Sequence, residues 1–130
     1  MKKYLVVNAD DFGYSPGVNR GIIKAHRQGI VTSTSVLVDG QAASEAKKLT
    51  SYSNLSIGLH FNITDEGLKA DIIKRLWLPL SKIKALKKEF DRQVEKFQKI
   101  IGRGPDHLDS HHHLHLHPKI RPIFEEYSLS

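Results

Sequence analysis

The sequence contains no cysteine. This absence excludes disulfide bonds, thiolate metal sites, iron–sulfur clusters and cysteine nucleophiles. No apolar run approaches the ~18 residues that a membrane-spanning helix needs, so we expect no membrane partner. The apolar stretch near the N-terminus is only four residues long and two carboxylates follow it, which is not typical of a signal peptide. Together these absences predict a cytoplasmic protein.

The length and the charge distribution narrow the class of protein further. A chain of 130 residues can bury about two-thirds of its unfolded surface, so we expect a single domain over 1–130. The net charge of +6 arises in residues 66–104, which hold eleven Lys and Arg against five Asp and Glu. Because a basic helix face is more often solvated surface and no recognised nucleic-acid motif accompanies this one, we interpret these charges as the solvated face of a helix and expect no nucleic-acid partner.

Strands and helices are predicted to alternate four times along the chain. The apolar and β-branched runs predict strands, and the spacings of three and four residues predict helices. The predicted strands cover 4–8, 32–38, 55–61 and 107–111, and the predicted helices cover 15–29, 41–49, 80–101 and 118–127. Residues 65–79 are predicted to form a loop with about one helical turn. This alternation predicts an α/β fold whose parallel sheet is either open or part of a (β/α) barrel.

Three clusters of chemically capable side chains follow separate predicted strands. Asp10 and Asp11 follow the first strand, His60 ends the third, and a histidine-rich segment at 109–117 surrounds the end of the fourth. In a parallel sheet these strand ends meet at one rim, where α/β folds place their active sites. Taken singly, each cluster has a structural explanation, such as a helix cap for the aspartates or a packed ring for His60. Their coincidence at one rim favours a functional site.

The histidine-rich segment alternates between two kinds of side chain. On an extended backbone, one parity would hold histidines and an aspartate and the other mostly leucines. The residues of the polar parity are His107, Asp109, His111, His113, His115 and His117. Leucines interrupt the run and a helical pattern follows it, so it does not resemble a purification tag. A metal ion needs few ligands, so most of these histidines must orient others, contact substrate or lie exposed.

Without cysteine, one Asp and two His form the expected ligand set for a metal ion. Such a set suits Zn²⁺ with an open position for water, and it also suits Fe²⁺ or Mn²⁺ without excluding Mg²⁺. Water on such an ion becomes a nucleophile near neutral pH, and a neighbouring carboxylate can accept its proton. The residues therefore predict metal-assisted hydrolysis.

Four segments of the chain resemble, in order, the motifs of the YdjC-like carbohydrate deacetylases, which include the chitooligosaccharide deacetylases. These segments are 7–13, 29–35, 58–62 and 107–113. The resemblance implies a (β/α) barrel, one divalent metal ion (Mg²⁺ or Zn²⁺), and removal of acetyl groups from N-acetylated amino sugars such as chitooligosaccharides.

The resemblance also implies roles for individual residues. By position, Asp11, His60 and His111 would be the metal ligands, and Asp10 would be the base that activates water. We further assign Asn62, His113 and His115 to contacts with an N-acetylated oligosaccharide substrate.

The chain departs from the family in two respects. Family members are about twice as long, and their C-terminal half completes the barrel and brings a histidine that protonates the leaving amine. The segment near 65–79 is also shorter than in relatives. We therefore expect a catalytic-type domain that is incomplete at its C-terminal end, with an open sheet edge that a second copy of the chain could cover in a homo-oligomer.

Two other functions compete with deacetylation. A two-His-one-carboxylate site could belong to a non-haem iron oxygenase, although the alternation of strands and helices disfavours the all-β scaffolds common among them. A histidine-rich module that stores or delivers metal would explain 111–117, but it would not explain Asp10, Asp11 or His60. The number of metal ions per chain separates storage from catalysis, and acetate release against oxygen consumption separates the two enzymes.

Overall fold

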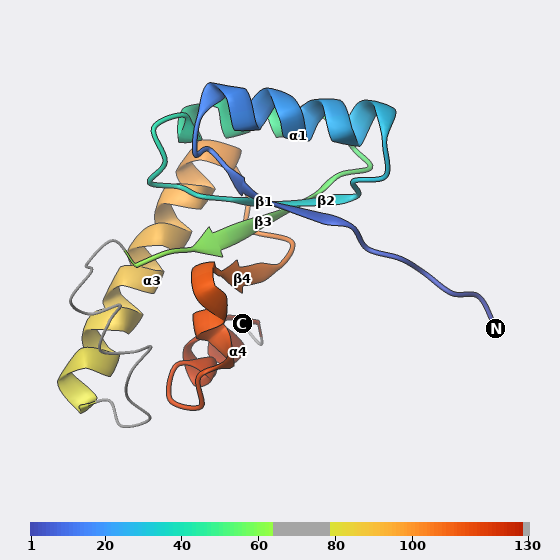
Figure 1. The fold of residues 1–130 in the computed structure, drawn as a ribbon. Helices are drawn as coiled ribbons and strands as arrows, with labels where there is room; N and C mark the ends of the chain where they lie inside the picture. Colours follow the sequence, from blue (N-terminus) through green and yellow to red (C-terminus); the bar gives the residue numbers. More distant parts are fainter. Residues whose placement is uncertain (64–78, 129–130) are drawn as a thin grey trace.

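The computed structural model describes residues 1–63 and 79–128 of the chain. Four parallel strands form one sheet in the order β1-β2-β3-β4, and helical segments connect successive strands along the chain (Figure 1). The strands are β1 (Asn8–Phe12), β2 (Ser33–Val36), β3 (Ser56–Phe61) and β4 (Leu108–Ser110). The helices are α1 (Pro16–Gln28), α3 (Leu80–Ile101) and α4 (Arg121–Ser128), with 3-10 helices η1 (Ala43–Ser51) and η2 (His111–Leu116). This arrangement confirms the predicted α/β fold and is consistent with part of a barrel.

Helix α1 begins and ends where the sequence predicts. The Ser15 side chain accepts a hydrogen bond from the Val18 amide at 3.2 Å, and Pro16 occupies the first turn, where its missing N–H costs nothing. The helix also carries a buried polar residue, Asn19, whose Oδ1 accepts from the Gly13 amide at 2.6 Å. Its Nδ2 donates to the Ala42 carbonyl at 3.1 Å. One side chain thus joins the end of β1 to the start of η1.

Helix α3 matches the predicted 80–101 segment and carries the main apolar contacts of the core. Its buried face consists of Leu86, Phe90, Gln93, Val94, Phe97 and Ile101. The Phe90 ring packs edge-on against Phe61 of β3 and Phe124 of α4. The helix ends at Gly102, whose φ of 92° is a left-handed conformation that glycine adopts without a Cβ clash.

The two faces of the sheet differ in chemistry because the strand register aligns residues of one kind. One face of the sheet packs against the helices. Its side chains belong to Ala9, Thr34, Ile57 and Leu108, together with the buried Val36, Leu59 and Phe61. The opposite face of the sheet carries the side chains of Asn8, Ser33, Ser35, Ser56, His60 and Asp109. The sheet therefore presents one apolar face to the helical layer and one polar face, which bears the candidate site.

Two predicted strand boundaries are wrong. The strand predicted at 4–8 begins only at Asn8, and Tyr4, Leu5 and Val6 are 88%, 78% and 73% exposed. Asn8 lies opposite Ser33, the first residue of β2. The pairing of β1 with β2 therefore starts at Asn8 rather than at Tyr4. The 41–49 element exists, but as the 3-10 helix η1 rather than an α-helix.

The fourth strand, predicted over 107–111, is shorter, and the backbone of the histidine-rich segment does not stay extended to His117. Strand β4 ends at Ser110, and η2 follows at once. His112 and His113 adopt φ values of 57° and 54°, so the chain turns sharply there. The predicted alternation of histidines and leucines on two faces therefore does not continue beyond the strand.

The loop predicted at 65–79 falls almost entirely outside the described residues. Among the residues that are described, no helix has the length and apolar character needed to cross a bilayer.

Candidate metal centre

The two adjacent aspartates lie inside β1 rather than after it, and a bulge in the strand brings both to the polar face. Ala9 pairs with Thr34 and Phe12 pairs with Val36, so Asp10 and Asp11 together oppose the single residue Ser35. Asp11 has a φ of 65°, the left-handed conformation that such bulges use. Regular alternation would point the two carboxylates to opposite faces. The bulge instead allows both to approach His60, and Phe12 returns to the core.

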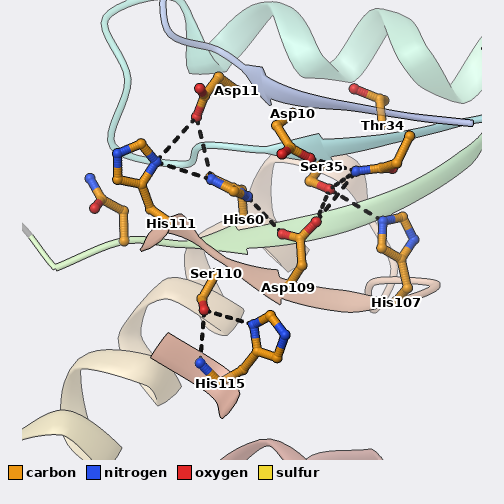
Figure 2. A network of polar contacts seen from close by, with 12 residues as sticks. Asp10, Asp11, Thr34, Ser35, His60, His107, Asp109, Ser110, His111 and His115 are labelled. Carbon is orange, nitrogen blue, oxygen red and sulfur yellow. Dashed lines mark hydrogen bonds and ion pairs between the residues drawn. The ribbon is translucent and has the colours of Figure 1, made fainter. Parts of the chain in front are cut away.

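The structure brings the three predicted metal ligands together (Figure 2). His60 Nε2 lies 3.4 Å from Asp11 Oδ1 and 3.3 Å from His111 Nδ1. His111 Nδ1 lies 3.8 Å from the same Asp11 oxygen. The three residues come from β1, the end of β3 and the start of η2, as expected for a rim formed by parallel strands. His60 is 4% exposed, whereas Asp11 and His111 are partly exposed and leave a path to solvent.

Asp109 fixes the orientation of the His60 ring. His60 Nδ1 donates to Asp109 Oδ1 at 2.7 Å, so Nε2 retains its lone pair and faces Asp11 and His111. Burial lowers the pKa of His60, but the hydrogen bond to Asp109 and the surrounding carboxylates raise it above its ordinary value. Burial raises the pKa of Asp109, but the hydrogen bonds from His60 and Ser35 outweigh this effect and lower it. This carboxylate–histidine pairing is common behind metal-bound imidazoles.

The distances between the three donor atoms fit a small divalent ion. With metal–ligand bonds of about 2.0–2.1 Å and tetrahedral angles, two ligand atoms lie about 3.3 Å apart. The separations of 3.3, 3.4 and 3.8 Å are close to this value. Two imidazoles and one carboxylate also form an ordinary donor set for Zn²⁺, Fe²⁺ or Mn²⁺. The residues present therefore fit a metal ion.

A second group of potential ligands adjoins the first and shares His60. It consists of Asp10, His60 and Asp109, with one donor atom from each within 4.8 Å of the others. The hydrogen bond between His60 Nδ1 and Asp109 already uses that side of the ring. The group of Asp11, His60 and His111 is therefore the better candidate for the first ion.

The remaining predicted substrate contacts occupy different surroundings. His113 is exposed, and its ring lies 6.1 Å from that of His115. His115 lies on the far side of β4 from the three ligands, where its Nδ1 is 2.8 Å from Ser110 Oγ and its backbone amide donates to that oxygen (Figure 2). Among the described residues, neither candidate ligand group includes His113 or His115. Their assignment to substrate stays a prediction.

Asn62 follows β3 directly, and helix α3 holds its backbone. The Asn62 amide donates to Gln93 Oε1 at 3.2 Å, and Gln93 Nε2 donates to the Asn62 carbonyl at 2.6 Å. The side-chain Oδ1 of Asn62 is buried and has no hydrogen-bond partner among the residues that the structure describes. An unsatisfied acceptor at the end of β3 is consistent with the predicted contact to substrate, which stays a prediction.

Sequence reasoning assigned no individual role to the residues that hold the ligands in place, and it named Asp109 only as a member of the polar, histidine-rich segment. Asn8, Ser35 and Asp109 share a hydrogen-bonded network behind His60, and Gln93 secures the end of β3 from helix α3. The signal for the first three lies in the strand register, which places all of them on the polar face. Gln93 is a polar residue within an otherwise apolar helical stripe, and that irregularity could have identified it.

Comparison with known proteins gives two results. A family model described as YdjC-like protein matches residues 4–128. The crystal structure of a proposed cellobiose-phosphate cleavage protein from Enterococcus faecalis V583 is similar to this chain, with a TM-score of 0.72 and 30% sequence identity. The match covers 95% of this chain and 54% of that protein, so the chain spans about half of its length.

Proposed function

The chain belongs to the YdjC-like family, which is related to the carbohydrate deacetylases, and on this basis we propose that it takes part in metal-dependent hydrolysis of the acetamido group of N-acetylated amino sugars. The observation that carries the proposal is the convergence of Asp11, His60 and His111 beside a further carboxylate, Asp10. The ligand set also matches what the sequence motifs implied.

The residues of the site divide into those that hold the ion and those that act on substrate. Asp11 Oδ1, His60 Nε2 and His111 Nδ1 would hold a divalent ion. When bound, the ion supplies Lewis-acid chemistry, lowering the pKa of water and polarising a carbonyl oxygen. Asp109 keeps the proton of His60 on Nδ1, so the ring presents Nε2 in the form that a metal needs.

We assign the role of general base to Asp10. Its Oδ1 accepts from Asn8 Nδ2 at 2.6 Å, which orients the carboxylate, and the side chain is exposed on the polar face next to the ligands. In the reaction, Asp10 takes a proton from the attacking water as the oxygen bonds to the acetyl carbon and the carbonyl π bond opens. The C–N bond then breaks, and the amine leaves with one proton, which balances the proton that Asp10 removed from water. Asn62 Oδ1, which is buried and unsatisfied, supplies an acceptor for a hydroxyl or amide N–H of the sugar.

The name of the structural neighbour raises a second reaction, the cleavage of a glycosidic bond. Glycoside hydrolysis generally needs two carboxyl groups that are free to act as acid and as nucleophile or base. Here Asp109 is engaged by His60 and Ser35, and Asp11 belongs to the candidate ligand set. Of the carboxylates that the structure describes at this site, only Asp10 remains, so the site favours hydrolysis of the acetamide.

Acetate release tests the proposal directly. The chain would be loaded with Zn²⁺, Mn²⁺ or Mg²⁺ and incubated with N,N′-diacetylchitobiose, and with cellobiose 6-phosphate as the competing substrate. We expect acetate from the first substrate and no new reducing ends from either. Reducing ends without acetate would support glycoside cleavage, and oxygen consumption with Fe²⁺ would support the oxygenase. A protein that binds no divalent ion would contradict the proposed function altogether.

A further inference from the structure

The side-chain amide of Asn8 lies between the two carboxylates of the second ligand group. Asn8 Nδ2 is 2.6 Å from Asp10 Oδ1, 2.7 Å from Ser35 Oγ and 3.4 Å from Asp109 Oδ2 (Figure 2 shows the surrounding network). An ionised carboxylate only accepts hydrogen bonds. The nitrogen of Asn8 must therefore donate toward Asp10, and its second hydrogen points to Ser35.

The hydrogen bonds that continue from Asn8 have a single consistent direction. Ser35 accepts from Asn8 and donates its own hydrogen to Asp109 Oδ2 at 2.5 Å. Asp109 Oδ1 accepts from His60 Nδ1. Because Asn8 Nδ2 is also 3.4 Å from Asp109 Oδ2, its two hydrogens are shared among three acceptors and lie toward both carboxylates.

Without the Asn8 amide, the same surroundings would suit a second ion. Asp10 and Asp109 bring carboxylate oxygens within 4.8 Å of each other, and carboxylates completed by water are ordinary ligands for Mn²⁺. His60 is not counted in this set, because its Nε2 faces the first ion and its Nδ1 donates to Asp109. Two negative charges this close also attract a cation. The partly positive N–H groups of Asn8 lie between these carboxylates and use their lone pairs.

We propose that Asn8 restricts this centre to one metal ion, because its amide takes the place between Asp10 and Asp109 that a second cation would otherwise occupy. The inference rests on the proposed function only in that the first ion binds at Asp11, His60 and His111. It explains how Asp10 can stay next to a metal centre without becoming a ligand itself. A carboxylate that binds no ion retains the basicity that proton transfer needs.

The substitution Asn8→Asp tests this inference with almost no change in shape. It removes both N–H donors and adds an oxygen ligand and a negative charge between Asp10 and Asp109. Mn²⁺ is the suitable probe because it prefers oxygen donors over the exposed histidines. Metal content after equilibrium dialysis should rise from one Mn²⁺ per chain in the parent to two in the variant. Electron paramagnetic resonance should show the spin coupling of two neighbouring Mn²⁺ ions only in the variant.

The matched control is Asn54→Asp, which adds the same charge elsewhere. Asn54 precedes β3 at the opposite end of that strand from His60, and within the part of the chain that the structure describes its side chain hydrogen-bonds only to His26. This control should bind one Mn²⁺. A second control adds Asp10→Asn to Asn8→Asp, and it should lose the second ion while it keeps the first.

The outcomes separate this inference from the proposed function. A parent with one ion and an Asn8→Asp variant with one ion would overturn the inference and leave the proposed function intact. A parent that binds no ion would overturn the proposed function, and the inference with it. If Asn8→Asp does not fold, Asn8→Ala serves instead and should admit a second, weaker Mn²⁺; a single ion at saturating Mn²⁺ would then contradict the inference.

Discussion

His60 Nδ1 donates to Asp109 Oδ1 at 2.7 Å, and this contact determines which nitrogen of the ring faces Asp11 and His111. Asp109 lies opposite His60 in the register of β3 and β4, so the two side chains share the polar face of the sheet. Metal binding at the proposed centre would therefore depend on Asp109, a residue outside the candidate ligand set of Asp11, His60 and His111.

The substitution Asp109→Asn should weaken metal binding. Asparagine cannot accept from both His60 and Ser35 with the same atoms, because one of its two terminal atoms is now a donor. Loss of such a supporting carboxylate typically costs about 10–100-fold in metal affinity. Competition with a chromophoric chelator measures this change. Asp91→Asn, an exposed substitution on α3, is the matched control and should leave the affinity unchanged; equal losses in both variants would point to a general effect of charge.

The three histidines of the motif region should behave differently when each is replaced by alanine. His60→Ala and His111→Ala remove atoms of the candidate ligand set, so each should strip the metal ion. His115→Ala should retain it, because His115 bonds to Ser110 on the far side of β4. Metal content after dialysis distinguishes the variants. Equal loss from all three would indicate diffuse binding by a histidine cluster rather than one centre.

Gly58 should not tolerate a methyl group while His107 keeps its place. A Cβ at Gly58 would lie 2.2 Å from His107 Nε2, the atom that also approaches Ser35 at 3.3 Å. We expect Gly58→Ala to lower the free energy of unfolding by about 1–3 kcal/mol, the usual cost of overpacking. In a His107→Ala background the clash is absent, so Gly58→Ala should then cost much less. Urea denaturation of the four proteins in this cycle gives the coupling, and additive costs would contradict the contact.

Sequence patterns predicted some parts of the fold and of the candidate site, but not others. The spacing of apolar residues predicted helix α3 because a long amphipathic period and a terminal glycine leave few alternatives. The meeting of Asp11, His60 and His111 was also predictable, since parallel strands end at one rim. Asn8 and Ser35 were not, because their contacts depend on the register between strands rather than on the order of residues along one strand.

The two wrong predictions near the site have a common physical origin. The strand at 4–8 was inferred from an apolar, β-branched run, and the two-sided arrangement of 107–117 from local alternation. Neither pattern contains where the neighbouring strand ends or where the backbone turns. Positive φ values at Asp11, His112 and His113 interrupt that alternation. Left-handed conformations of residues other than glycine carry a cost and persist only where surrounding contacts impose them, so a local pattern cannot reveal them.

An ion-pair network outside the site should make stability depend on pH. Burial raises the pKa of Asp39, but hydrogen bonds from Arg92 and Lys96 outweigh this and lower it. An acid whose pKa is lower in the folded state stabilises the protein above its unfolded pKa of about 3.9, and this contribution disappears as the pH falls through the folded value. Asp39→Asn should cost about 1 kcal/mol at neutral pH and progressively less below about pH 4. Chemical denaturation at both pH values measures it; a constant difference would show that the charge of Asp39 is irrelevant.

The paired aspartates of β1 should separate metal binding from chemistry. Asparagine tolerates the left-handed conformation of Asp11 nearly as well as any residue except glycine, so Asp11→Asn should keep the bulge but remove a charged ligand. We expect this variant to lose metal affinity with little change in unfolding temperature. Asp10→Asn should instead keep the ion and lower the rate of acetate release by about 10²- to 10⁴-fold, as for a lost general base. Metal content and acetate release from an N-acetylated disaccharide, measured for both variants, test this division. If Asp10→Asn loses the ion while Asp11→Asn retains it, the two roles are exchanged. If both variants keep metal and full activity, the bulge presents the two carboxylates for a purely structural reason.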